Sequence, residues 1–225
     1  MLLYYITDRK QFPGDETARR RALLAKIAEA AASGVDFIQL REKDLSGKEL
    51  ESMARGVMQI VGESSGRNHQ TLRTRLLINS RVDVAIACGA GGVHLRSDDI
   101  PIKDVRHIWR SASSTESSPL VSVSCHTTAE VARAASEGAD FVVFAPVFEK
   151  KDMPQSSPAG LQALQEACRH KIPVLALGGI TLENVRSCFE AGAAGIAGIR
   201  LFQEQRIAET VKLLRATEST TEARK

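Results

Sequence analysis

The chain has 225 residues and a net charge of +3, from 30 Lys and Arg against 27 Asp and Glu, and 4% of its residues are aromatic. This size and a hydrophobic content of 43% suit one large or two small globular domains, and the near-neutral charge with few aromatic residues argues against a nucleic-acid surface. No apolar run approaches the roughly 18 residues of a membrane span, and the four cysteines form no C-x-x-C pair. We therefore expect a cytoplasmic protein with reduced cysteines that binds neither nucleic acid nor membrane.

Strands and helices are predicted to alternate along the whole chain. A glycine followed by a short apolar run recurs about every 50 residues, at Gly34, Gly89, Gly138 and Gly192. Each glycine ends an Ala-rich helical stretch, and each apolar run is typical of a buried parallel strand. In chain order, strands are expected over residues 2–6, after Gly34, over 75–78, after Gly89, over 120–124, after Gly138, over 173–177 and after Gly192.

This alternation predicts an α/β fold, a single (β/α)8 TIM barrel. Strand–helix units of about 28 residues fill residues 1–214, and a polar tail that is expected to fray follows over residues 215–225. A doubly wound open sheet is the alternative. The regular period favours the closed barrel, because a repeat of two strand–helix units that occurs four times gives eight strands, the number in a closed barrel of this kind. No second domain is expected.

The strongest candidate for a binding site follows the second strand. Barrel enzymes carry their active sites at the carboxyl ends of the strands. Gln39, Arg41 and Lys43 occupy alternating positions there, which places them on one side of the strand. Three polar groups that point inward need an anionic or hydrogen-bonding ligand. Contact with water, in contrast, is expected to account for polar strand ends such as Thr7 and His94.

The fifth strand carries Ser124 and His126 on one face and Cys125 on the other. Neighbours on a strand cannot meet, so a nucleophilic pair of Cys125 and His126 is excluded, and Cys125 is expected to pack against the helices. We assign His126 a proton-transfer or ligand-positioning role, and a core histidine with satisfied hydrogen bonds is the alternative interpretation.

Two glycine-containing loops are candidates for a phosphate site. Gly178 and Gly179 follow the seventh strand, and Gly198 and Arg200 follow the eighth. Barrels commonly bind phosphate between these two loops through backbone N–H groups. The long connection over residues 149–158 lies at the same end of the barrel, and we hypothesise that it closes as a lid.

Taken in order, the motifs of this chain resemble those of the thiamine phosphate synthase/TenI family. The resemblance runs from Tyr5 to Phe202, and each motif falls at its proper strand. The motifs are Tyr5-Ile6-Thr7-Asp8, Gln39-Leu40-Arg41-Glu42-Lys43, Leu77-Ile78-Asn79, Arg81-Val82-Asp83-Val84-Ala85, Gly92-Val93-His94-Leu95, Ser122-Val123-Ser124-Cys125-His126-Thr127, Pro146-Val147-Phe148 and Ala176-Leu177-Gly178-Gly179-Ile180-Thr181.

The resemblance implies a transferase of thiamine biosynthesis. Such an enzyme joins hydroxymethylpyrimidine diphosphate to hydroxyethylthiazole phosphate and releases diphosphate, and these phosphorylated substrates are the expected partners. Whether the chain forms a homo-oligomer is left open. By the same resemblance, Mg²⁺ is bound with Asp99, and Ser124, His126 and Lys43 take part in catalysis. The residues expected to hold the substrates are Gln39, Arg41, Lys43, Asn79, Lys150, Lys151, Gly178, Gly179, Gly198 and Arg200.

Four positions depart from the synthase pattern. The family's Asn-Asp is Asn79-Ser80, which lacks one expected Mg²⁺ carboxylate, and its Gly-Gln is Arg96-Ser97. The serine of the loop after the eighth strand is Arg200. The lysine of the loop after the sixth strand is Met153, for which the candidate replacements are Lys150 and Lys151.

These departures leave two alternatives beside the synthase. A TenI-type thiazole tautomerase needs a phosphate cradle and an acid/base, for which His126 occupies the TenI position, but it needs no Mg²⁺. A non-catalytic regulator that binds a phosphorylated ligand is the other alternative. The synthase is the prediction, because it is favoured by the intact set of Gln39, Arg41, Lys43, Asn79 and Asp99.

Overall fold

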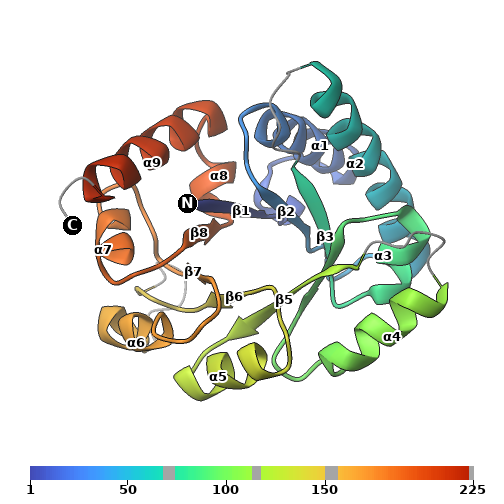
Figure 1. Cartoon of the computed structure of the whole chain (residues 1–225). Coiled ribbons are helices and arrows are strands. Elements are labelled where there is room, and N and C mark those ends of the chain that lie inside the picture. The colour runs from blue at the N-terminus through green and yellow to red at the C-terminus, as the bar shows by residue number, and fades with distance from the viewer. Residues whose placement is uncertain (68–73, 113–117, 150–156, 223–225) are drawn as a thin grey trace.

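The strands pair in chain order, all parallel, and β1 returns to pair with β8, so that the sheet closes into a barrel (Figure 1). The computed structural model describes residues 1–67, 74–112, 118–149 and 157–222. Over these residues the barrel has eight strands, which confirms the predicted (β/α)8 fold. The strands are β1 Leu2–Ile6, β2 Phe37–Leu40, β3 Arg75–Asn79, β4 Gly92–Leu95, β5 Leu120–Cys125, β6 Phe141–Phe144, β7 Val174–Ala176 and β8 Gly195–Gly198.

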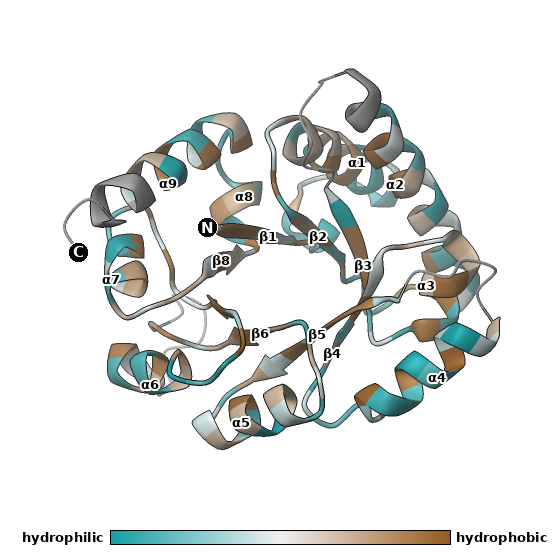
Figure 2. Ribbon diagram, viewed as in Figure 1, coloured by the Kyte–Doolittle hydropathy of each residue, from teal (hydrophilic) through white to brown (hydrophobic). Residues whose placement is uncertain are grey.

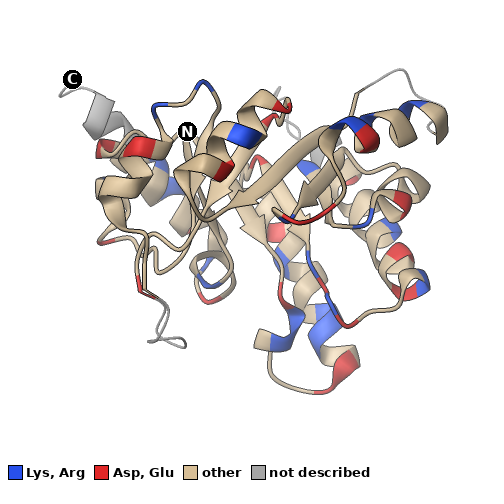
Figure 3. Cartoon of the chain, turned by 90° about the horizontal axis from the view of Figure 1, so that it is seen from below, with Lys and Arg blue, Asp and Glu red and all other residues tan. Residues whose placement is uncertain are grey.

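Helices surround the barrel and turn their apolar sides toward it (Figure 2). Lys, Arg, Asp and Glu lie mainly on the helices and the connections between elements (Figure 3). None of the helices in the described part of the chain is long and apolar enough to cross a membrane. The helices are α1 Glu16–Ala32, α2 Gly47–Arg67, α3 Val82–Cys88, α4 Ile102–Ala112, α5 Thr128–Ser136, α6 Gly160–Ala167, α7 Val185–Glu190, α8 Arg200–Gln203 and α9 Ile207–Glu222, and a 3-10 helix, η1, spans Arg9–Gln11.

Apolar side chains fill the barrel interior near its amino end. The rings of Phe37 and Phe141 stack with their centroids 4.8 Å apart, and the ring of Tyr4 meets Phe141 edge-on at 5.5 Å. Leu77 and Leu175 complete this inner cluster, which is separate from the larger core between the strands and the helices. Because the amino end is filled in this way, polar residues near the carboxyl ends of the strands are the ones that can meet a ligand.

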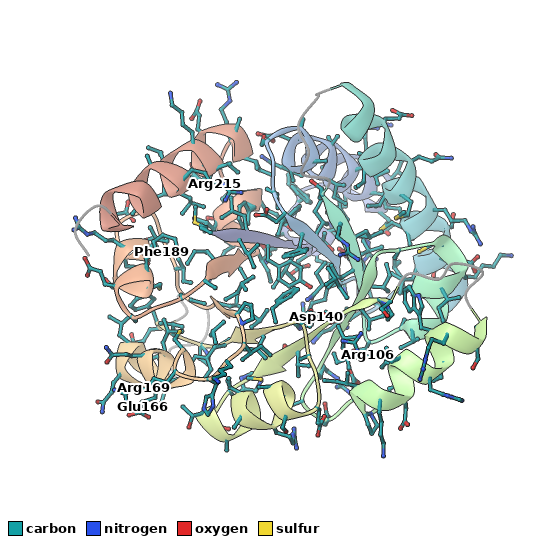
Figure 4. The ribbon with its side chains drawn as sticks, viewed as in Figure 1. Arg106, Asp140, Glu166, Arg169, Phe189 and Arg215 are labelled. Atoms are coloured by element: carbon teal, nitrogen blue, oxygen red, sulfur yellow. The ribbon has the colours of Figure 1, made fainter. Side chains whose placement is uncertain are left out.

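In two of the four repeats, the residue two positions after the glycine is an aspartate that links neighbouring strands by a hydrogen bond. Asp36 and Asp140 each accept a hydrogen bond of 2.7 Å from a backbone N–H of the preceding strand. Each also pairs with an arginine. Asp36 pairs with Arg215 at 3.1 Å, and Asp140 pairs with Arg106 at 3.2 Å, the latter two labelled in Figure 4. The Gly-x-Asp pattern is therefore structural.

Helix α9 runs through the end that was predicted for the barrel. The sequence predicts a frayed tail from Arg215, but α9 continues to Glu222. The Arg215 guanidinium donates to the backbone oxygen of Met1 and pairs with Asp36, which fixes the helix against β1 and the start of β2.

Candidate active site

A buried carboxylate holds the segment that carries Arg41 and Lys43. Glu42 is 5% exposed, and its Oε1 accepts a hydrogen bond of 2.7 Å from the hydroxyl of Thr7. Its Oε2 accepts from the backbone N and the Nη1 of Arg9, at 3.1 and 3.0 Å. The Thr7 hydroxyl oxygen accepts in turn from the backbone N–H of Arg41 at 2.9 Å. Thr7 is fully buried, so contact with water does not account for it; it positions Arg41.

Arg9 makes this arrangement a buried ion-pair network. It is 3% exposed, and its guanidinium contacts Glu42 together with Glu16 and Asp44. The hydrogen bond from Arg9 is the main reason why the pKa of Asp44 lies well below its usual range. A buried guanidinium that donates to three carboxylates is held in one orientation, because every rotation away from it would break several charge-assisted hydrogen bonds at once.

Arg41, Lys43 and Arg96 form a group of positive charges at the carboxyl end of the barrel. The charge of Arg41 is the largest cause of a lowered pKa for Lys43, burial is the next, and the charge of Arg96 adds to both, against the opposing effect of Asp8. Within the residues that the structure describes, the side chains of Arg41 and Lys43 have no ion-pair partner. Arg41 and Lys43 are thus like charges without a counter-ion, which attract an anion, so this cationic group is the core of the candidate site.

A chain of hydrogen bonds links β3 to the connection after β4. The Asn79 side-chain N–H donates to the Ser80 hydroxyl at 3.2 Å, and that hydroxyl donates to Asp99 Oδ2 at 2.6 Å. The backbone N–H of Arg96 donates to the same Oδ2 at 2.8 Å, while its Nε and Nη2 both lie 3.3 Å from Oδ1. Ser80 has a φ of +58°, a left-handed conformation that serine rarely adopts.

The residues around Asp99 do not fit the magnesium site that the resemblance implies. Both carboxylate oxygens already accept hydrogen bonds, Oδ2 from Ser80 and Oδ1 from the Arg96 guanidinium. Across the described ranges, no three His, Cys, Asp or Glu side chains gather where they could hold a metal ion. Mg²⁺ binds through carboxylate oxygens, and the Arg96 guanidinium, which pairs with both Asp98 and Asp99, competes for them.

His94 is the residue that sequence reasoning missed. It lies inside the barrel, 3% exposed, with Nδ1 2.8 Å from the Ser122 hydroxyl and Nε2 2.8 Å from the Ser124 hydroxyl. Burial, and next the charge of Arg41, lower its pKa to about 3, against the opposing effect of Asp99. The imidazole is therefore neutral at pH 7 and joins the two serines. The strand register places His94 opposite Ser122, a pairing that the sequence of β4 alone does not reveal.

Gln39 lies deeper than predicted. It is 1% exposed, and its Nε2 donates to the hydroxyl of Tyr4 at 3.0 Å inside the barrel. Burial raises the pKa of Tyr4 well above its usual value, so the phenol stays protonated. Gln39 thus forms part of the polar layer beneath the cationic group rather than part of the group itself.

Ser124 and His126 serve different neighbours. Ser124 contacts His94, as described, whereas exposed His126 donates from Nδ1 to the backbone oxygen of Ala145 at 2.7 Å, which leaves Nε2 as the basic nitrogen. Cys125 is fully buried in the outer core, and burial raises the pKa of its thiol to about 12. This confirms that Cys125 packs against the helices.

The loop after β7 approaches the loop after β6 so closely that it requires glycine. Gly178 and Gly179 have φ values of +100° and +63°. A Cβ on Gly179 would lie 2.3 Å from the backbone oxygen of Glu149, and one on Gly178 would lie 2.8 Å from Pro146. Among the described residues, the N–H groups of the two glycines have no hydrogen-bond acceptor, which leaves them available to a phosphate.

The loop after β8 places Gly198 in the buried sheet and Arg200 at the start of α8, half-buried. Helix α8 has four residues and α7 has six, so neither supplies the dipole of a long helix. Lys150, Lys151 and Met153, with most of the predicted lid, lie outside the described residues.

A cavity of about 160 Å³ opens to one side of the strand ends, between the connection after β4 and helix α5. Arg96, Asp99 and Ser124 contribute to its lining, whereas Arg41 and His126 do not. Asp99 and Ser124 thus meet the cationic group at one end of the barrel, but the predicted residues do not all line this one hollow.

Comparison with known proteins points in one direction. The family model described as thiamine monophosphate synthase matches residues 3–202. The chain is 36% identical to a putative thiamine-phosphate synthase 2 of Aquifex aeolicus, over 90% of this chain and 97% of the relative. It is also 37% identical to the thiamine-phosphate synthase of Methanoculleus marisnigri, over 88% and 85% of the two chains.

Solved structures show the same likeness. The thiamine phosphate pyrophosphorylase of Pyrococcus furiosus superposes with a TM-score of 0.78 at 26% identity and covers 98% of this chain and 96% of its own. A 3-hexulose-6-phosphate synthase superposes with a TM-score of 0.62 at 17% identity, over 96% and 97% of the two chains. At that identity the second likeness concerns the barrel fold alone.

Proposed function

The chain belongs to the thiamine monophosphate synthase family, and we propose that its strand ends join hydroxymethylpyrimidine diphosphate to hydroxyethylthiazole phosphate. The resemblance expected from the sequence is confirmed by the match over residues 3–202. Thiamine-phosphate synthase activity, a transferase activity of thiamine biosynthesis, is the function that relatives of 37% and 34% identity over 88% and 99% of the chain support.

The cationic group of Arg41, Lys43 and Arg96 is the observation that carries the proposal. Arg41 and Arg96 depress the pKa of Lys43, so the three charges act on one region of space. A diphosphate ester brings several negative charges, and negative charge grows on the diphosphate as it leaves. Fixed cations placed where charge develops stabilise the transition state more than the ground state.

The reaction is a substitution at the pyrimidine methylene carbon. The carbon–oxygen bond breaks, and its electron pair leaves with the diphosphate. The thiazole nitrogen donates its lone pair to the methylene carbon, which forms the new carbon–nitrogen bond and a thiazolium cation. No proton is transferred in this balance, so the chain is asked to orient the substrates and neutralise charge. Arg41 and Lys43 meet the diphosphate. With the proton of neutral His94 on Nε2, the imidazole donates to Ser124, and the hydroxyl hydrogen of Ser124 is left to donate to the diphosphate or to the ring.

The second substrate carries its own phosphate. The free N–H groups of Gly178 and Gly179 are suited to this phosphate, because amide donors in a glycine turn form an anion-binding concavity. Gly198 and Arg200 of the loop after β8 are proposed as the facing side, with Asn79 and Gln39 on the pyrimidine side. Lys150 and Lys151 keep their predicted roles as additional cations.

Mg²⁺ at Asp99, which the resemblance implies, stays a prediction that the local hydrogen-bond donors do not favour. No step above depends on it. A cytoplasmic location likewise stays a prediction; the described cysteines are all free thiols.

The proposal is tested by incubating purified protein with both substrates, with Mg²⁺ or with EDTA, and measuring thiamine phosphate and diphosphate. We expect both products in equal amounts, and we expect Arg41→Ala and Lys43→Ala to abolish nearly all of their formation. No thiamine phosphate under either condition would reject the proposal.

One observation favours a second candidate, the TenI-type tautomerase. The hydrogen bond from His126 Nδ1 to Ala145 leaves an exposed basic Nε2, as a proton shuttle requires. Consumption of the thiazole carboxylate phosphate tautomer that is lost in His126→Ala would establish that activity. Saturable ligand binding without either turnover would identify a regulator.

A further inference from the structure

The geometry around Asp99 points to a guanidinium in the place of a metal ion. We propose that Arg96 supplies the positive charge that grips the substrate's diphosphate group, so that this chain binds diphosphate without Mg²⁺. The inference rests on the proposed function for the identity of the anion, and it concerns how that anion is held.

Carboxylates hold the Arg96 guanidinium in place but do not occupy all of its N–H donors. Its Nε and Nη2 face Asp99 Oδ1 at 3.3 Å, and its Nε lies 3.4 Å from Asp98 Oδ1. Both contacts use the same edge of the guanidinium. The Nη1 edge remains, and the side chain is 59% exposed. A planar fork held along one edge presents its other donors in a fixed direction, which suits the oxygens of a phosphate.

Arg96 also lies close enough to Lys43 for its charge to lower the pKa of that side chain. The charges of Arg96 and Arg41 both act on Lys43. Arg96 lies in the connection after β4, whereas Arg41 and Lys43 lie in the connection after β2. An anion near Lys43 would therefore be attracted by three positive groups that come from two different connections. Such an arrangement supplies, from the chain's own residues, the charge compensation that a bound divalent cation gives elsewhere.

Ser80 contacts the other oxygen of Asp99. A carboxylate at this position would add a second metal-ligating group beside Asp99. The serine hydroxyl instead donates a hydrogen bond of 2.6 Å to Asp99 Oδ2, and thus uses a lone pair that a metal ion would need. Asp99 is thus bonded to Ser80 and Arg96, and Asp98 is paired with Arg96, so both carboxylates already have partners, while Arg41 and Lys43 add two further positive charges for an anion.

The experiment titrates the purified full chain with inorganic diphosphate by calorimetry, once in EDTA and once in Mg²⁺. We expect wild-type protein to bind diphosphate in EDTA, and Arg96→Ala to weaken that binding by about 10- to 100-fold, the range for one charged hydrogen-bond donor. Arg186→Ala is the matched control, since Arg186 is also an exposed arginine paired with a carboxylate, on α7. It should bind as wild type does. Wild-type binding that disappears in EDTA, or an Arg96→Ala variant that binds unchanged in EDTA, would overturn the inference.

A second variant tests the same inference in the opposite direction, because its diphosphate binding is expected to become dependent on Mg²⁺. The double variant Ser80→Asp/Arg96→Gly removes the guanidinium and adds a second carboxylate; aspartate tolerates the left-handed backbone at this position. We expect its diphosphate binding to require Mg²⁺, and binding that stays equal with and without Mg²⁺ would contradict the inference. The proposed function fails separately, on the absence of thiamine phosphate from both substrates, whatever the titrations give.

Discussion

The Nε2 atom of His94 lies 2.8 Å from the hydroxyl oxygen of Ser124, and its Nδ1 atom lies equally close to the hydroxyl of Ser122. One neutral imidazole thus connects two serines of the neighbouring strand β5, accepting a hydrogen bond from one hydroxyl and donating one to the other. Of the two serines, Ser124 lies nearer the carboxyl end of β5. The charges of Arg41 and Asp99 both affect the pKa of the His94 imidazole that it contacts. The polar interior of the barrel is in this way continuous with the site.

The buried His94 predicts that acid destabilises the fold. Its pKa is about 3 in the folded chain, against 6.5 as its ordinary value, so the unfolded chain binds more protons between these values. Stability is then fully present above pH 6.5 and falls as the pH falls toward 3, by about 2 kcal/mol at pH 5. Urea unfolding at pH 7.5 and pH 5 measures it. His94→Gln should lose less stability over this range than wild type, whereas His107→Gln, at an exposed position, should lose as much.

The contact between His94 and Ser124 predicts non-additive effects on catalysis. Ser124→Ala should lower kcat by about 10- to 100-fold, because it removes a hydroxyl that meets the reacting groups. His94→Gln acts through that hydroxyl, so the double variant should be little worse than Ser124→Ala alone. Steady-state kinetics of the four proteins measure the coupling, and fully multiplicative effects would contradict it.

Glu42 is predicted to be essential for stability although it touches no substrate. Glu42→Gln removes the buried one of the three carboxylates that meet Arg9 and weakens the hydrogen bonds from Thr7 and Arg9, so it should destabilise the fold by about 3 kcal/mol. Chemical denaturation measures the loss. The control is Glu51→Gln, where the carboxylate pairs with exposed Arg55 and the expected loss is below about 0.5 kcal/mol. Equal losses in the two variants would show that the Arg9 network is not the reason.

Gly179 and Gly138 both have a positive φ, but only Gly179 is crowded, so substituting each by alanine distinguishes the effect of backbone strain from that of crowding. Gly138→Ala, where nothing lies within 4 Å of the new methyl group, should cost about 1 kcal/mol for the left-handed conformation alone. Gly179→Ala places a methyl group 2.3 Å from the Glu149 oxygen, so the loop must move. We expect a larger loss of stability and weaker binding of the thiazole phosphate, with KM rising more than kcat falls. An unchanged KM would remove Gly179 from the phosphate site.

Most of the fold could be predicted because its signals are local. Gly89 ends α3 in the left-handed conformation, and the strand predicted over residues 2–6 is β1. The continuation of α9 past Arg215 was missed, because what holds it is a contact with Asp36, far away in the sequence.

The candidate site was predicted less completely. Alternation along the second strand predicted Gln39, Arg41 and Lys43 on one side; Arg41 and Lys43 lie close enough for their charges to interact, whereas Gln39 is buried against Tyr4. This pattern could not show that the neighbouring Glu42 pairs with Arg9, a contact across 33 residues that depends on how the barrel curves. Alternation also could not show that the Arg96 guanidinium bonds to Asp99. In a sequence, a charged residue of a connection that pairs with a neighbour looks the same as one that only contacts water.

The central claim is that the cations beside Asp99 direct the departure of diphosphate from the pyrimidine carbon. Its most direct measurement is a single-turnover assay with both substrates, in which thiamine phosphate and diphosphate are quantified for wild type, Arg41→Ala and Arg186→Ala. The account predicts one diphosphate per thiamine phosphate in wild type and in Arg186→Ala, and almost none of either in Arg41→Ala. Undiminished thiamine phosphate formation in Arg41→Ala would contradict it.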